Sequence, residues 1–215
     1  MRRTFILLLL SLTVTSLASA AGWKKSYFGA TKPGTWALYN DHTSYPQTGD
    51  MTTTMTRLDN EGGQPRIEMK MGSGGEDAML VLVTLKKGFA IDRELIDYGK
   101  AIVAVSGGDV KTQKPLDADA VAKMVDTMPR YEPAAVFKGS EDIDGKKADH
   151  YVYTLTHPGG SVETGELWLS DAVPFGVLRN TFTITQKSGK ITITCDRKLV
   201  ASGAGAAAQA PKSQR

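Results

Sequence analysis

Cysteine and histidine are scarce in this sequence. Cys195 is the single cysteine, and the three histidines are His42, His150 and His157. One cysteine cannot form an internal disulfide, and no histidine lies close in sequence to activate it, so we expect a small buried residue there. His150 and His157 are seven residues apart in one alternating run, which places them on opposite faces of a strand. The histidines therefore do not form a zinc-binding set.

Catalytic motifs are lacking as well. The chain has no G-x-S-x-G nucleophile elbow. The glycine-rich run at 72–77 lacks the Lys and the Ser or Thr of a phosphate-binding loop. Glu163 and Glu166 are three residues apart in a strand-like run, so they face opposite ways. We interpret the protein as a non-enzyme that needs no cofactor.

The acidic run SEDIDG at 140–145 is similar to part of a calcium-binding loop. Asp142 and Asp144 stand at alternate positions, as in such loops. The first and twelfth loop positions are serine and tyrosine here, where calcium needs carboxylates. We therefore interpret the Asp-Gly pair at 144–145 as a hairpin turn.

The longest apolar run lies at the N-terminus and is too short to span a membrane. Arg2 and Arg3 precede the apolar stretch 5–17, which falls below the roughly 20 residues that a spanning helix needs. The small residues at 18–20 form a cleavage site. The pattern predicts a signal peptide over 1–20, cut before Ala21. We expect export to a periplasm or the exterior, and no transmembrane segment after cleavage.

An excess of charge of either sign is also missing. The chain has 26 basic and 23 acidic residues and a net charge of +3. Removal of residues 1–20 would take away two basic residues and no acidic ones, leaving a charge of about +1. A balanced surface argues against a nucleic-acid partner, which normally binds a basic stripe.

Alternation of apolar and polar residues is the main pattern present. The run RIEMKM at 66–71 places Ile67, Met69 and Met71 on one face. Such alternation predicts strands with one buried face, and the Gly-containing turns between them predict hairpins. The run at 78–86 is continuously apolar and fits either a buried strand or a short helix. We expect strands near 35–45, 50–59, 65–72, 78–86, 88–94, 100–106, 134–143, 147–157, 162–170, 178–187 and 190–199.

One segment has helical periodicity. Asp117 is a suitable N-cap, apolar residues recur at helical spacing up to Met128, and Pro129 ends the pattern. A helix of this length is marginal alone in water, so it must dock its apolar side on the sheet. About eleven strands must curl rather than stay flat. The predicted fold is therefore mainly β with one or two helices: a curved antiparallel sheet that forms an unclosed half β-barrel, with a helix against its concave face.

We expect a single domain over 21–200. The segment 201–215 is rich in alanine and glycine and has too little apolar bulk to pack. It is predicted to be a disordered tail.

Methionines supply the candidate ligand site. Two lie on one face of the strand near 50–59 and two on the next strand, and a hairpin at 59–63 would bring the rows together. Methionine is flexible and adapts to varied apolar partners. Ordinary core packing explains the same pattern, and a copper site would need a nearby His or Cys. The predicted lining is Met51, Met55, Met69, Met71, Val121, Met124 and Met128.

A stretch over about 138–180 resembles the LolA-like, outer-membrane lipoprotein-sorting superfamily of periplasmic proteins. Its motifs are G-x-E-x-[IV]-[DN]-G, a tyrosine-bearing strand, and a Trp followed by an acidic turn and a Pro. A related group of periplasmic proteins carries W-x-S-D-x-V-P-x-G, here Trp168 to Gly176. The matching positions are Gly139, Glu141, Ile143, Asp144, Gly145, Tyr151, Trp168, Asp171 and Pro174.

The resemblance implies an unclosed antiparallel barrel that encloses an apolar cavity for acyl chains. Our first hypothesis is accordingly a non-enzymatic protein that binds a lipid or lipoprotein acyl chain in a concave sheet. The second is an interaction or structural module with a filled core, which contacts an envelope protein through rim loops such as 157–165. The third is a hydrolase whose site is assembled from distant residues.

Overall fold

The structure is a computed structural model of the chain. Its eleven strands form one antiparallel sheet in the order β6-β5-β4-β3-β2-β1-β11-β10-β9-β8-β7. The described residues are 25–45, 48–73, 76–91, 101–109, 114–127, 135–157 and 159–205. The elements are η1 (Lys25–Phe28), β1 (Thr35–Tyr45), β2 (Gly49–Glu61), β3 (Gln64–Ser73), β4 (Glu76–Leu85), β5 (Ile102–Asp109), β6 (Lys114–Pro115), α4 (Ala118–Thr127), β7 (Val136–Ile143), β8 (Lys146–Thr156), β9 (Val162–Leu169), β10 (Val177–Thr185) and β11 (Ile191–Ala204).

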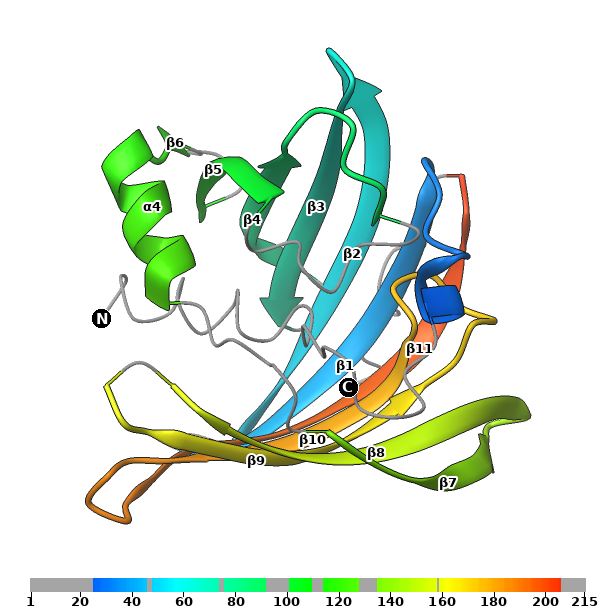
Figure 1. The fold of residues 1–215 in the computed structure, drawn as a ribbon, viewed down its shortest axis with the longest axis vertical. Helices are drawn as coiled ribbons and strands as arrows, with labels where there is room; N and C mark the ends of the chain where they lie inside the picture. The colour runs from blue at the N-terminus through cyan, green and yellow to red at the C-terminus, as the bar shows by residue number, and fades with distance from the viewer. Residues whose placement is uncertain are drawn as a thin grey trace.

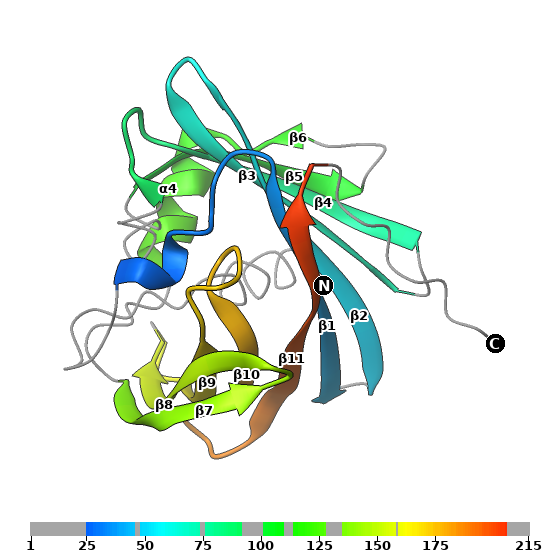
Figure 2. The ribbon, with the colours of Figure 1, turned by 90° about the vertical axis from the view of Figure 1, so that its right-hand side faces the viewer.

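The sheet is strongly curved and does not close (Figure 1). Its two ends, β3–β6 and β7–β9, face each other across the concave side, and α4 and η1 lie at the open side (Figure 2). Eleven twisted strands cannot stay flat, so the curvature follows from strand number. The predicted fold class is confirmed: the protein is mainly β, with an unclosed antiparallel sheet and a helix at its concave face.

The hairpins form at the glycine turns. Glu61 pairs with Gln64 at the end of the β2–β3 hairpin, as the turn signal at 59–63 predicted. Asp144 and Gly145 both have positive φ, 50° and 74°, in the turn between β7 and β8. Positive φ at both central positions is what a type I′ hairpin turn requires. The acidic run at 140–145 therefore builds a turn, as expected.

The predicted helix is present as α4. The Ala120 backbone N–H donates to Asp117 Oδ1 at 2.7 Å, which confirms Asp117 as the N-cap. Val121 and Met124 point into the main apolar core, so the helix docks through one side as expected. Contacts between α4 and β5 place the helix at the end of the sheet that carries the predicted methionines. Met128 lies outside the described residues.

The segment predicted as a strand near 88–94 does not form one over its described part. Phe89 and Ile91 are buried, but they follow a turn in which the Phe89 N–H bonds to the Lys86 carbonyl. Gly88 has a φ of 77°, which breaks the extended path. Apolar side chains reach the core from this turn without a strand partner. Residues 92–100 lie outside the described part. The ambiguous run at 78–86 is strand β4, and the short β6 was not predicted.

The tail prediction is wrong at its start, because β11 continues to Ala204. Ala201 pairs with Leu38, and Gly203 pairs with Trp36. A Cβ on Gly203 would lie 3.0 Å from the Trp36 ring, so glycine leaves room for the indole. Main-chain pairing needs no bulky side chains, which is why composition did not reveal it. Residues 206–215 lie outside the described part.

Candidate functional site on the concave face

The predicted methionines gather on the concave face of β2 and β3. Met55 and Met69 are direct cross-strand partners, and Met71 pairs with Met79 of β4. Met55, Met69 and Met71 are fully buried, whereas Met51 is partly buried at the edge of the same core. The expected register of the two methionine rows is confirmed.

Apolar side chains from β3, β4 and β5 continue this surface. Ile67, Val81, Val83 and Val105 belong to the same buried cluster as the methionines, as do Val121 and Met124 of α4. We call the concave faces of β2–β5 together with α4 the methionine half. Six of the seven predicted lining residues lie together in it, and the seventh is the undescribed Met128.

The concave face of β1 and β8–β11, which we call the polar half, has a different interior. Asp41 of β1 and Arg197 of β11 face each other in register, and both are almost completely buried. The Arg197 Nε and Nη2 atoms lie 2.5 and 2.9 Å from the two Asp41 carboxylate oxygens. Thr53 of β2 donates to Asp41 Oδ2 at 2.5 Å. Such a bidentate, fully bonded pair is the arrangement that lets charges remain inside a protein.

Tyr39 completes this ion-pair cluster. The Arg197 guanidinium carbon lies 5.2 Å from the centre of the Tyr39 ring, within cation–π range. The Tyr39 hydroxyl is buried and has no hydrogen-bond partner among the described residues. Burial raises the pKa of this hydroxyl above its ordinary value, so it stays protonated. Tyr39 also stands on the boundary between the two halves, because its strand partner is Thr53 of β2.

A second polar cluster joins β8, β9 and β10. The Tyr153 hydroxyl lies 3.0 Å from Glu163 Oε1 and 3.1 Å from Asn180 Oδ1. Glu163 is buried, and its other oxygen lies 2.9 Å from His157 Nε2. Gly165 makes room for the tyrosine, since a Cβ there would lie 2.5 Å from the Tyr153 hydroxyl. The groups next to the His157–Glu163 pair are therefore a tyrosine hydroxyl and an amide.

A third cluster ties η1 to the sheet. Tyr27 donates to the buried Asp149 carboxylate, which also accepts from Ser140. The Tyr27 and Tyr151 hydroxyls are 3.1 Å apart. Burial and the bond to Asp149 raise the pKa of Tyr27, which therefore acts as a donor. These bonds fasten the N-terminal segment over the β7–β8 end of the concave face.

The motif from Trp168 to Gly176 forms the β9–β10 connection beneath η1. Phe175 has a φ of 61°, and its N–H donates to Thr31 Oγ1 at 2.7 Å. A Cβ on Gly176 would lie 2.7 Å from the Tyr27 carbonyl oxygen. The motif thus anchors the segment around η1, and its glycine permits the close approach. These residues have structural roles.

Sequence reasoning separated the two faces correctly but missed the buried charges. His150 and Glu166 lie together on the outer face, whereas His157 and Glu163 lie together inside. Cys195 is buried as expected, and burial raises the pKa of its thiol to about 12. Among the described residues, no group of three or more His, Cys, Asp and Glu side chains could hold a metal.

Comparisons with known proteins found similarity to solved structures alone. No family model matches the sequence, and no curated protein matches it. MucB in complex with MucA(peri) is 11% identical to this chain, with a TM-score of 0.43; 86% of this chain and 55% of the MucB chain are covered. A second MucB structure is covered over 60% of its length, so this chain spans little more than half of MucB.

Two further solved structures are covered over most of their length. The protein CT021 from Chlamydia trachomatis is 10% identical, with a TM-score of 0.47, and 89% of this chain and 96% of that chain are covered. An outer membrane lipoprotein-sorting protein domain from Vibrio parahaemolyticus is 9% identical, with a TM-score of 0.32 and coverages of 79% and 84%. The structural neighbours thus include a protein of the group that the sequence resembles. At these identities the similarity concerns the fold.

Within the described part of the chain, no helix is both long and apolar enough to cross a membrane.

Proposed function

We propose that this protein is an exported, non-enzymatic binding protein that holds an acyl chain of a lipid or lipoprotein against its methionine half. The observation that carries the proposal is the cross-strand alignment of methionines facing helix α4. Met55 pairs with Met69, and Met71 pairs with Met79. Met124 of α4 belongs to the same core.

The physical basis is the adaptability of methionine. Three rotatable bonds and a polarizable sulfur let the side chain repack around partners of different shape. Burial of an acyl chain contributes about 0.8 kcal/mol per CH₂ group. A helix that packs mainly against β5, next to the end strand β6, is suited to move and admit a chain.

The cellular location is part of the proposal. The charged and apolar pattern of residues 1–20 supports a cleavable signal peptide with a cut before Ala21. A periplasmic or secreted carrier needs no cofactor, in agreement with the absence of catalytic motifs from the sequence. Its protein partner would be an envelope protein that delivers or receives the acylated ligand.

The test measures acyl binding in a matched pair of variants. Met51→Glu places a charge at the partly buried edge of the methionine half, whereas Thr52→Glu places the same charge on the opposite face of β2. We expect a fluorescent fatty acid to bind the wild type and Thr52→Glu equally, and Met51→Glu at least tenfold more weakly. Native mass spectrometry of protein from its own host should show acyl-chain adducts. Absence of adducts and of probe binding would remove the proposal.

The rival function is an interaction module whose concave face is filled. Tyr39, Met55 and Met69 are each only 1% exposed, which favours this alternative. Methyl NMR on labelled methionines distinguishes the two. A carrier shows shifts of the Met55 and Met69 methyl signals when the fatty acid is added, whereas a filled module shows none.

A further inference from the structure

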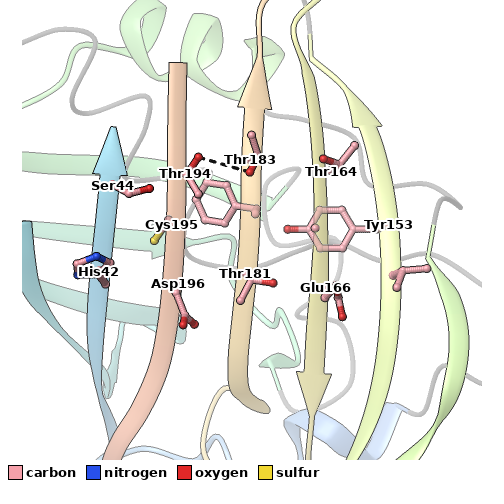
Figure 3. A pocket seen from close by; sticks show the side chains of 13 residues that line it. His42, Ser44, Tyr153, Thr164, Glu166, Thr181, Thr183, Thr194, Cys195 and Asp196 are labelled. Carbon is pink, nitrogen blue, oxygen red and sulfur yellow. Dashed lines mark hydrogen bonds between the residues drawn. The ribbon is translucent and has the colours of Figure 1, made fainter. Parts of the chain in front are cut away.

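The outer face of the sheet has a polar hollow that the carrier function does not use. It has a volume of about 530 Å³ and lies over β1, β11, β10, β9 and β8 (Figure 3). Strand alternation and exposure place its serine, threonine, histidine, glutamate and aspartate side chains on the face opposite the methionines. Tyr153, Phe182 and Cys195 also line the hollow but belong to the buried core, so the hollow and the concave face share strands and these three residues.

Short hydroxyl side chains form the first row of the hollow. Thr164, Thr183 and Thr194 are in direct cross-strand register on β9, β10 and β11. Ser44 extends this row onto β1 (Figure 3). The Thr183 and Thr194 hydroxyl oxygens are 3.5 Å apart. Each hydroxyl can donate one hydrogen bond and accept two, so the row offers both functions to a ligand.

A second row runs parallel to the first and carries ionisable groups. Glu166, Thr181, Asp196 and His42 occupy successive strands in register. Between the rows lie residues such as Phe182, whose side chain is buried in the core. The hollow exists because the side chains of the first row are short.

Both carboxylates are held from outside the hollow. Glu166 Oε2 lies 2.8 Å from His150 Nε2. The His150 ring stacks on the Trp168 ring, with 4.5 Å between the ring centroids. Asp196 accepts two bonds from Arg179, at 3.0 and 2.9 Å. Burial of Asp196 raises its pKa, but the bonds from Arg179 outweigh this and leave the pKa below its ordinary value. The carboxylates are thus oriented before a ligand arrives.

The charges select the ligand class. The lining includes two carboxylates and no lysine or arginine, so an anionic ligand is disfavoured. Arg179 and Lys198 already pair with Asp196, which reduces the attraction for a cation. An apolar ligand would desolvate hydroxyls and carboxylates without replacing their hydrogen bonds. A neutral ligand with many hydroxyl groups satisfies all three conditions.

We propose that this hollow is a binding site for a neutral carbohydrate, whose hydroxyls bond to the threonine row and to the oriented carboxylates of Glu166 and Asp196. The site does not depend on the acyl-binding proposal, because the hydroxyl and carboxylate side chains of the two rows face the other side of the sheet. A glycan would lie across the strands, along the two rows in Figure 3.

The test titrates the full chain with neutral hexose and N-acetylhexosamine tetramers, using calorimetry and backbone NMR. We expect at least one neutral tetramer to bind and to shift the signals of β9–β11. The double variant Thr183→Val/Thr194→Val keeps the β-branched shape but removes two hydroxyls, so binding should weaken roughly tenfold or more. Thr54→Val, on the outer face of β2 away from the hollow, is the matched control and should bind as the wild type does.

Three results would overturn the proposal: no binding of any neutral tetramer, equal binding by the double variant, or tighter binding of a uronic-acid tetramer than of the neutral ones. Thermal melting checks that the variants are folded. The fatty-acid assay gives an unchanged result for the double variant whether or not the glycan proposal holds, so failure of one proposal is distinguishable from failure of the other.

Discussion

The methionine half and the polar half are built from the same alternating strands but hold their interiors together differently. In the methionine half, side chains such as Met55 and Met69 contact one another without directed bonds. In the polar half, Asp41, Arg197 and Glu163 are fixed by hydrogen bonds of defined geometry. Directed buried bonds penalise displacement, whereas methionines can repack. We expect the directed bonds to keep the polar half rigid and the methionines to make their half the more adaptable of the two.

The largest expected effect comes from breaking the buried ion pair. Arg197→Met leaves the Asp41 carboxylate buried without its cation, so we expect a loss of about 3–5 kcal/mol in the free energy of unfolding. Arg179→Met is the control, because its partner Asp196 is partly exposed, and it should cost about 1 kcal/mol or less. Urea unfolding measures both. Similar losses in the two variants would contradict the rigid role of the polar half.

The next effect concerns the shape tolerance of the methionine half. Met69→Ala removes buried atoms and should cost about 3 kcal/mol. Met69→Leu keeps the volume and should cost less than about 1.5 kcal/mol. Thermal and urea unfolding give the two values. If Met69→Leu lowers the free energy of unfolding as much as Met69→Ala does, the methionine half is tightly packed rather than adaptable.

At Tyr39, on the boundary between the two halves, we expect a smaller effect that stabilises the protein. Tyr39→Phe removes a buried hydroxyl that has no partner among the described residues, and should raise the free energy of unfolding by about 1 kcal/mol. Tyr153→Phe is the matched change and should lower it by a similar amount, because Tyr153 bonds to Glu163 and Asn180. The two variants are compared by urea unfolding at neutral pH. Destabilisation by Tyr39→Phe would show that the hydroxyl has a partner.

The smallest effect is a pH dependence at Cys195. Burial raises the pKa of this thiol from 9.0 to about 12, so the unfolded chain loses the proton first as the pH rises. The unfolded state is then favoured, and stability falls between pH 9 and 12. Between pH 7 and pH 9 the wild type should lose about half a kcal/mol more of its free energy of unfolding than Cys195→Val does. A constant difference across this range would contradict the raised pKa.

Much of the fold could be predicted because alternation is a local property. A strand with one buried face shows period two in its own sequence, as at Ile67, Met69 and Met71. Helix α4 was equally readable from Asp117 and its apolar spacing. The methionine half was therefore predictable from short stretches of sequence.

The polar half could not be predicted, because its bonds join distant residues. Asp41 and Arg197 are 156 positions apart, and each alone looks like a polar interruption of an apolar face. The sequence held one weak indication of this pair. An acidic residue lies on the inward face of β1, and a basic residue lies on the inward face of β11. The outer hollow was missed for the same reason, since its rows of threonine appear only when the register of four strands is known.

The first and last strands pair with each other in the middle of the sheet, as Trp36 and Gly203 show. The two sheet halves meet at this seam, so a newly made chain lacks the partner of β1 until β11 has been synthesised. Contacts this distant in sequence slow folding. For the exported protein that we propose, such a delay would keep the chain unfolded and competent for translocation. Truncation before β11 should therefore yield no folded fragment, whereas joining the ends of β1 and β11 and reopening the chain at an outer hairpin should speed folding.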